Sequence, residues 1–116
     1  MSYDIEMEDE NGVVYIKHHH FKGGTYPLGG TTRAYMNITY NYSEFYYKTI
    51  DQEKGINWLN GKTGAECLPV LEKSVRILGI KKSDDYWEAT SGNAGNALLG
   101  LIAFCKSRPD GIFKVM

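Results

Sequence analysis

Residues 90–105, TSGNAGNALLGLIAFC, contain no charged side chain. The apolar residues recur at helical spacing and also fill the intervening positions, so a helix here is apolar on nearly all sides. Such a helix belongs in the middle of a core, because the run is shorter than the roughly 20 residues of a membrane span. We therefore predict a central helix over residues 91–105, with Leu98, Leu101 and Ile102 fully buried.

Length and composition indicate one globular domain over residues 1–116, with 42% hydrophobic and 23% charged residues. The net charge of −1 and the dispersed Lys and Arg residues argue against binding of duplex nucleic acid. The two cysteines lack the spacing of a disulfide framework or a zinc site, and the acidic start is unlike a signal peptide. We expect a cytoplasmic protein that neither spans nor binds a membrane.

The N-terminal residues predict a β-hairpin. Residues 3–8 alternate between apolar and acidic side chains, and a second strand-like run follows over residues 13–21. Between them, Asn11-Gly12 is typical of a two-residue type I′ turn. That turn predicts a register in which Met7 faces Ile16, with the partners Ile5 and His18 one step further along.

A third strand is predicted over residues 34–42, and a last strand over residues 112–116. Ser43 is expected to cap a short helix that ends at residue 50. With the helices described here, the chain is predicted to be α+β: a mainly antiparallel sheet of about four strands, with two or three helices packed on one face.

Thr63 to Glu66 read as a capping box that opens a further helix, and Gly79 is the expected stop. Pro69 lies inside this helix, where it removes a hydrogen bond and clashes with the preceding turn. We expect a kink or a fresh start there. Residues 22–33 form a glycine-rich loop, either a flexible connector or a binding loop.

All three histidines are consecutive, from His18 to His20, and His18 and His20 share one face of a strand. Two ligands are too few for a zinc site, so neither a metal nor another cofactor is predicted. A phosphodiesterase that uses His18 and His20 is an alternative, but no nucleophile, base and orienting group accompany them. The sequence therefore favours a non-enzymatic binder over an enzyme.

The start of the central helix is the first candidate site, because unpaired N–H groups and glycines can receive an anion. The alternative is that the glycines admit a neighbouring element. For a bound nucleotide, we expect the phosphate at the helix start with charge from the glycine-rich loop, bases stacked on tyrosine, and asparagines at the base edges. The candidate ligand-binding residues are Gly92, Asn93, Gly95, Lys22, Arg33, Tyr35, Tyr40, Asn37 and Asn41.

Several motifs between residues 37 and 116 resemble small uncharacterised proteins of tailed bacteriophages. They are the segment NITYNYS, an LPVLE helix, an aromatic-glycine-asparagine junction, and a final helix with a C-x-x-x-P ending before a strand, although Phe45 stands where methionine is usual. The resemblance implies a non-structural phage protein in the cytoplasm of the bacterial host. Such proteins often counter host defence, by sequestering a nucleotide signal or by blocking a host protein. The expected partner is thus a small anionic ligand or a host protein, and homo-oligomers are possible.

Overall fold

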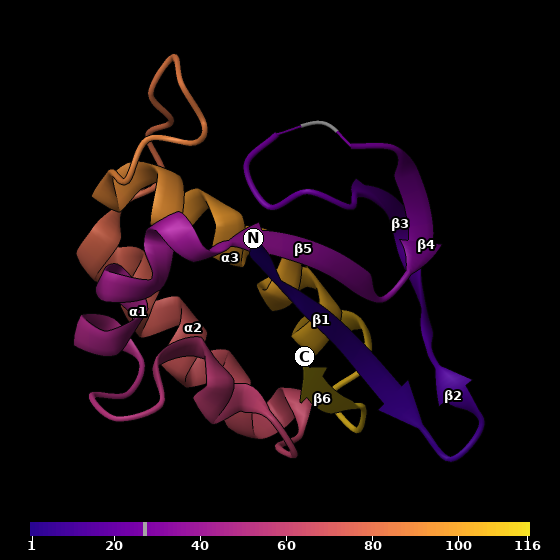
Figure 1. Ribbon diagram of the computed structural model, residues 1–116. Coiled ribbons are helices and arrows are strands. Elements are labelled where there is room, and N and C mark those ends of the chain that lie inside the picture. The colour runs from indigo at the N-terminus through magenta and orange to yellow at the C-terminus, as the bar shows by residue number, and fades with distance from the viewer. Residues whose placement is uncertain (27) are drawn as a thin grey trace.

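The computed structural model describes residues 1–26 and 28–116, so that Pro27 of the glycine-rich loop lies outside the described residues. It confirms the predicted α+β class, with an antiparallel sheet of four strands, a second sheet of two strands, and helices beside them (Figure 1). The elements, in chain order, are β1 (Ser2–Asp9), β2 (Gly12–Val13), β3 (Tyr15–Phe21), β4 (Gly30–Arg33), β5 (Tyr35–Thr39), the 3-10 helix η1 (Tyr40–Tyr42), α1 (Ser43–Thr49), the 3-10 helix η2 (Gly55–Leu59), α2 (Gly64–Leu78), α3 (Ser91–Ser107) and β6 (Ile112–Val115).

Strand β1 is the centre of the larger sheet. Ile5 pairs with both Met36 of β5 and Val115 of β6, so these strands lie on opposite edges of β1. The short strand β2 pairs with the end of β1, whereas β3 and β4 pair with one another in the second sheet. The inward face of the sheet carries the fully buried side chains of Ile5, Met7, Met36, Ile38 and Phe113.

The predicted hairpin register is wrong. Asp9 pairs with Gly12, and the turn residues are Glu10 and Asn11, so the pairing is shifted by two residues from the prediction. Of the turn and its flanks, only Gly12 has a positive φ, of 106°. The type I′ expectation therefore fails as well, because that turn needs positive φ at both central residues.

Strand β5 occupies the place where the prediction put the second hairpin strand. It sets Met36 and Ile38 opposite Ile5 and Tyr3. The hairpin would instead have placed His18 opposite Ile5, and apolar partners bury more favourably than imidazoles. A turn motif reports only the local preference of the backbone. It therefore could not predict that β5 would compete with the second hairpin strand for pairing with β1.

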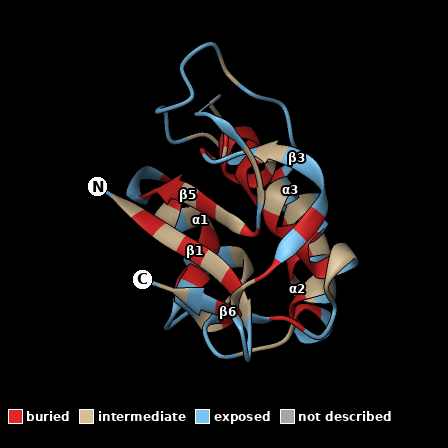
Figure 2. Ribbon diagram, turned by 90° about the vertical axis from the view of Figure 1, so that its right-hand side faces the viewer, coloured by how far each residue is buried: buried red, intermediate tan, exposed pale blue. Residues whose placement is uncertain are grey.

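Helix α3 is the buried centre that the sequence predicts, two residues longer than expected. Leu98 and Leu101 are fully buried and Ile102 is 8% exposed, which confirms their predicted burial. Thr90 caps the helix by accepting a hydrogen bond from the N–H of Asn93. Figure 2 shows the helix largely in red, among the sheet, α2 and β3. Leu99 is 38% exposed, so one side of the helix does reach water.

Helix α2 begins with the predicted capping box. Thr63 and Glu66 each bind the other's backbone N–H, and Gly79 ends the helix with a φ of 78°. The helix runs through Pro69 without a fresh start. Pro69 and Ala65, whose carbonyl loses its usual helical partner there, are both exposed, so water can hydrate that carbonyl.

The N-cap predicted at Ser43 is wrong. The strand ends at Thr39, three residues early, and Thr39 caps the 3-10 helix by accepting a hydrogen bond from the N–H of Asn41. The Ser43 hydroxyl instead donates backwards to the Tyr40 carbonyl at 2.7 Å.

Among helices of the described residues, none combines the length and apolar character needed to cross a bilayer.

Candidate functional site

Asn93, in the first turn of α3, fixes the loop that precedes the helix. Its side chain is fully buried, and its Oδ1 accepts a hydrogen bond from the N–H of Ser83 at 3.0 Å. Its Nδ2 lies 3.1 Å from Ser83 Oγ, 3.0 Å from the Asp85 carbonyl and 2.9 Å from the Glu88 carbonyl. One internal amide therefore holds residues 83–88 in a defined shape.

This loop presents two aromatic side chains to solvent. Tyr86 is 37% exposed and Trp87 is 45% exposed. Their backbone is held from the other side as well, because Asn41 donates to the Trp87 carbonyl at 2.7 Å and the Tyr42 hydroxyl donates to the Tyr86 carbonyl. The rings are thus exposed on a backbone that is fixed by hydrogen bonds.

Tyr26, from the glycine-rich loop, completes the group. Its ring stacks on Tyr86 with centroids 4.9 Å apart and lies 5.0 Å from Trp87, and the latter two rings are 5.4 Å apart. We call Tyr26, Tyr86 and Trp87 the aromatic cluster. Figure 1 shows the two parent loops, in violet and orange, at the same end of the molecule. Burial, and then the neighbouring Tyr86, raises the pKa of Tyr26.

The glycine-rich loop is ordered by specific contacts around this cluster. Gly23 bridges Asn37 of β5, and the Tyr26 hydroxyl donates to Asn37 Oδ1 at 3.2 Å. Thr25 donates to the Asn93 carbonyl, and Gly24 lies so close to α3 that a Cβ there would meet Ala97. Since residues 30–33 form β4, the described part of the segment is no structureless connector.

The structure brings part of the predicted ligand-binding set together. Lys22, Arg33 and Tyr35 border one hollow of about 170 Å³, with Glu6 and Thr31. The Tyr35 hydroxyl donates to Asp4 Oδ1 at 2.8 Å, and burial, with help from that carboxylate, raises the pKa of Tyr35 to about 12. This phenol is therefore neutral at physiological pH.

The predicted asparagines and the second predicted tyrosine already have partners within the fold. Asn37 Nδ2 donates to Ser2 Oγ and Asp4 Oδ1, and the Asn41 amide is bound to the Trp87 carbonyl. Tyr40 is 41% exposed and packs edge-on against Tyr3, with centroids 4.6 Å apart. To meet a base edge, either asparagine must first release these contacts. Their part in nucleotide binding stays a prediction.

Glycine at positions 92 and 95 has a packing explanation. A Cβ at Gly92 would overlap the Lys81 carbonyl, and one at Gly95 would overlap the Gly79 carbonyl. A hollow of about 340 Å³ beside the helix start is bordered by Gly92, Lys81 and Lys82. The two hollows share no residue, so the structure does not join Lys22 and Arg33 to the helix start. Anion binding at the helix start remains a prediction.

The three histidines lie within β3, where His18 and His19 are exposed. His20 packs edge-on against Phe104, and its Nδ1 and Nε2 lie 2.8 and 2.7 Å from the carbonyl oxygens of Phe21 and Arg33. Each ring nitrogen of His20 thus lies within hydrogen-bonding distance of a backbone carbonyl oxygen. Within residues 1–26 and 28–116, no three His, Cys, Asp or Glu side chains gather in a way that could hold a metal ion.

Cys67 and Cys105 are free thiols buried on α2 and α3. Burial raises the pKa of each to about 12. Since the thiolate is the reactive form, neither group is a nucleophile at physiological pH.

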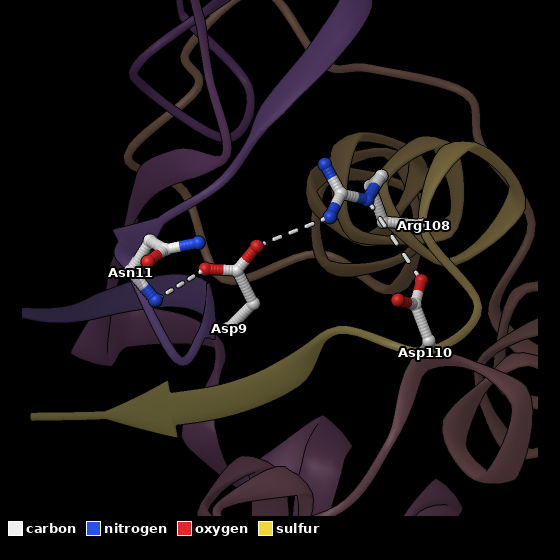
Figure 3. A network of polar contacts seen from close by, with 4 residues as sticks. All are labelled: Asp9, Asn11, Arg108 and Asp110. Atoms are coloured by element: carbon white, nitrogen blue, oxygen red, sulfur yellow. Dashed lines mark hydrogen bonds and ion pairs between the residues drawn. The ribbon is translucent and has the colours of Figure 1, made fainter.

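Arg108 pairs with two aspartates at the opposite end of β1 from the N-terminus. Arg108 Nη2 is 3.3 Å from Asp9 Oδ2 and Arg108 Nε is 3.8 Å from Asp110 Oδ1, while Asp9 also accepts from the N–H of Asn11 (Figure 3). These contacts tie the β1–β2 turn to the turn before β6. Partly exposed ion pairs contribute only about 0–1 kcal/mol each, so this network adds little to the stability of the fold.

Comparison with known proteins gave no match: no protein-family model, curated protein or solved structure proved similar to the chain. The resemblance to phage proteins therefore rests on the motifs of the sequence alone. The candidate site is defined by its geometry.

Proposed function

We propose that this protein is a non-catalytic binding protein, and that the aromatic cluster contacts a partner protein. The observation that carries the proposal is the exposure of Tyr86 and Trp87 on a loop held by the buried Asn93. Tyrosine and tryptophan are the side chains most enriched among the energetic hot spots of protein interfaces. A backbone that is fixed before binding loses little conformational entropy when the partner docks.

The shape of the cluster favours a protein over a small molecule. Small ligands bind in concave sites that enclose most of their surface. Tyr26 borders a hollow of about 230 Å³, whereas Tyr86 and Trp87 border neither that one nor the two hollows described above. The exposed parts of the Tyr86 and Trp87 rings are instead suited to contact with a partner protein.

Charges around the rings indicate the chemistry of the partner. Asp84, Asp85 and Glu88 are exposed in the same loop, although Lys81 and Lys82 lie at its base. An arginine or lysine side chain stacked over Trp87 would gain a cation–π contact of about 0.5–2 kcal/mol and could pair with a carboxylate. The partner is therefore expected to present a basic side chain to the cluster. In the phage context that the sequence resemblance implies, it would be a protein of the bacterial host.

The proposal is tested by capture from a bacterial extract, followed by cross-linking and mass spectrometry to locate the contact. The variant Trp87→Ala is compared with Tyr15→Ala, which truncates another exposed aromatic residue outside the cluster. Support requires a protein that is captured by the wild type and by Tyr15→Ala, is lost with Trp87→Ala, and cross-links to residues 81–88. Capture that does not depend on Trp87 contradicts the proposal.

Sequestration of a small anionic ligand such as a nucleotide is the second candidate. It is favoured by the hollow of about 340 Å³ where Lys81 and Lys82 meet the start of α3, because helix N-termini and lysines both attract phosphate. Calorimetric titration with cyclic and adenosine-derived nucleotides tests it, with Lys81→Ala/Lys82→Ala as the variant and Lys73→Ala as the control. If no nucleotide binds below about 1 mM, a threshold of only about −4 kcal/mol, this candidate fails.

A further inference from the structure

The hollow between the two sheets has an unusual set of charges. Thr31 and Arg33 lie on the same side of β4, Lys22 follows β3, and Glu6 and Tyr35 are a cross-strand pair of β1 and β5. Two basic side chains and one carboxylate therefore border a space of about 170 Å³.

These opposite charges do not neutralise one another directly. In the part of the chain that the structure describes, ion pairs form at Lys48–Glu44, Arg108–Asp9 and Arg108–Asp110, and none includes Glu6, Lys22 or Arg33. The basic groups and the carboxylate thus face one space while remaining free to bind something within it.

The Tyr35 ring beside them is held in place by hydrogen bonds. The Tyr35 hydroxyl donates to Asp4, which also accepts from Asn37 Nδ2 at 3.1 Å. These bonds orient the Tyr35 ring beside the hollow and leave the Asp4 carboxylate engaged with neutral donors. Glu6 is then the carboxylate available to a ligand.

We propose that this hollow binds a small zwitterion, an α-amino acid, with its carboxylate on Arg33 and Lys22 and its ammonium group on Glu6. The guanidinium fork matches a carboxylate through two parallel hydrogen bonds. Sites for drug-sized ligands usually measure about 300–1,000 Å³, so a space of about 170 Å³ suits a ligand of few heavy atoms. A simple anion fits less well, because Glu6 repels it. This site does not depend on the partner protein proposed for the aromatic cluster.

The test is an NMR titration of the full chain with each common L-α-amino acid, and with acetate, methylammonium and inorganic phosphate. We expect at least one amino acid to bind at least tenfold more tightly than acetate, methylammonium or phosphate, each of which carries charge of one sign only, with shifts at residues 31–35. That ratio corresponds to about 1.4 kcal/mol. If acetate or phosphate binds as tightly as every amino acid, or if no amino acid binds below about 10 mM, near −2.7 kcal/mol, the proposal is overturned.

Two variants separate the charges. Arg33→Gln should weaken both the amino acid and acetate, whereas Glu6→Gln should weaken the amino acid at least tenfold and leave acetate equal or tighter. Arg76→Gln and Glu53→Gln remove exposed charges elsewhere and should change nothing. Amide spectra of each variant confirm folding beforehand. Equal affinity of the amino acid for wild type and Glu6→Gln would overturn the zwitterion assignment.

Discussion

Replacing Asn93 by alanine should release the loop that carries the aromatic cluster. The Asn93 side chain holds residues 83–88 through hydrogen-bond contacts of 2.9 to 3.1 Å with Ser83, Asp85 and Glu88. Alanine is a better helix former than asparagine, so the substitution does not itself weaken the helix, and it removes every one of these contacts. The fold should survive, since Leu98 and Leu101 still fill the core around α3.

The magnitude follows from the number of bonds that the amide can make. Its Nδ2 carries two hydrogens, shared among three acceptors, and its Oδ1 accepts one bond from Ser83. Three bonds at about 1 kcal/mol each give a loss of about 3 kcal/mol. Asp85 and Glu88 are exposed residues, so opening of the loop lets water hydrate their carbonyls and limits the loss to about this value.

Urea denaturation measures the stability, and amide hydrogen exchange over residues 83–88 reports on the loop. The matched control is Asn96→Ala on the same helix, because Asn96 is partly exposed and makes one bond of 3.3 Å, to the Ile80 carbonyl. It should cost less than about 1 kcal/mol. If Asn93→Ala lowers the unfolding free energy no more than Asn96→Ala and leaves hydrogen exchange in the loop unchanged, Asn93 does not hold residues 83–88.

Three further predictions concern the core and the titratable groups. Leu101→Ala should cost about 2–5 kcal/mol in urea denaturation, and a loss below about 1 kcal/mol would contradict its place in the core. Cys67 and Cys105 should react with a thiol reagent at pH 8 only on unfolding, because burial raises the pKa of each to about 12; rapid labelling of the native protein would refute this. Tyr35, whose pKa rises from 10.0 to about 12 on folding, should contribute stability that is complete below pH 10 and lost toward pH 12, a loss that Tyr35→Phe should lessen when unfolding is followed across that range.

The sequence predicted those elements whose signal is carried by their own residues. The uncharged run over residues 90–105 predicted α3, because a helix that is apolar on nearly all sides is stable in a globular protein only when it is buried in the core. The Thr63 capping box likewise marked the start of α2. The hairpin register failed because β5, about thirty residues away along the chain, competes for β1 with better apolar partners.

The aromatic cluster could not be predicted from local patterns. Tyr26 and Tyr86 lie 60 positions apart in polar loops, and only the tertiary fold stacks them. One signal was present, namely Asn93, an amide side chain within the uncharged run of residues 90–105. A buried amide must find partners, and residues 83–88 supply them. The sequence interpretation considered only the N–H groups of the helix start, as donors to an anion, and gave the Asn93 side chain no partner.

The central claim is that the aromatic cluster binds a partner protein, and the most direct test is the affinity of a captured partner for the wild type and for Trp87→Ala, measured by calorimetry. Trp87 is 45% exposed and also packs against Tyr26 and Tyr86, so its truncation should lower the unfolding free energy by about 1–3 kcal/mol and leave the chain folded. A hot-spot tryptophan contributes about 2 kcal/mol or more, so we predict that Kd rises at least about 30-fold. An unchanged Kd, in a variant that urea denaturation shows to be folded, would contradict the claim.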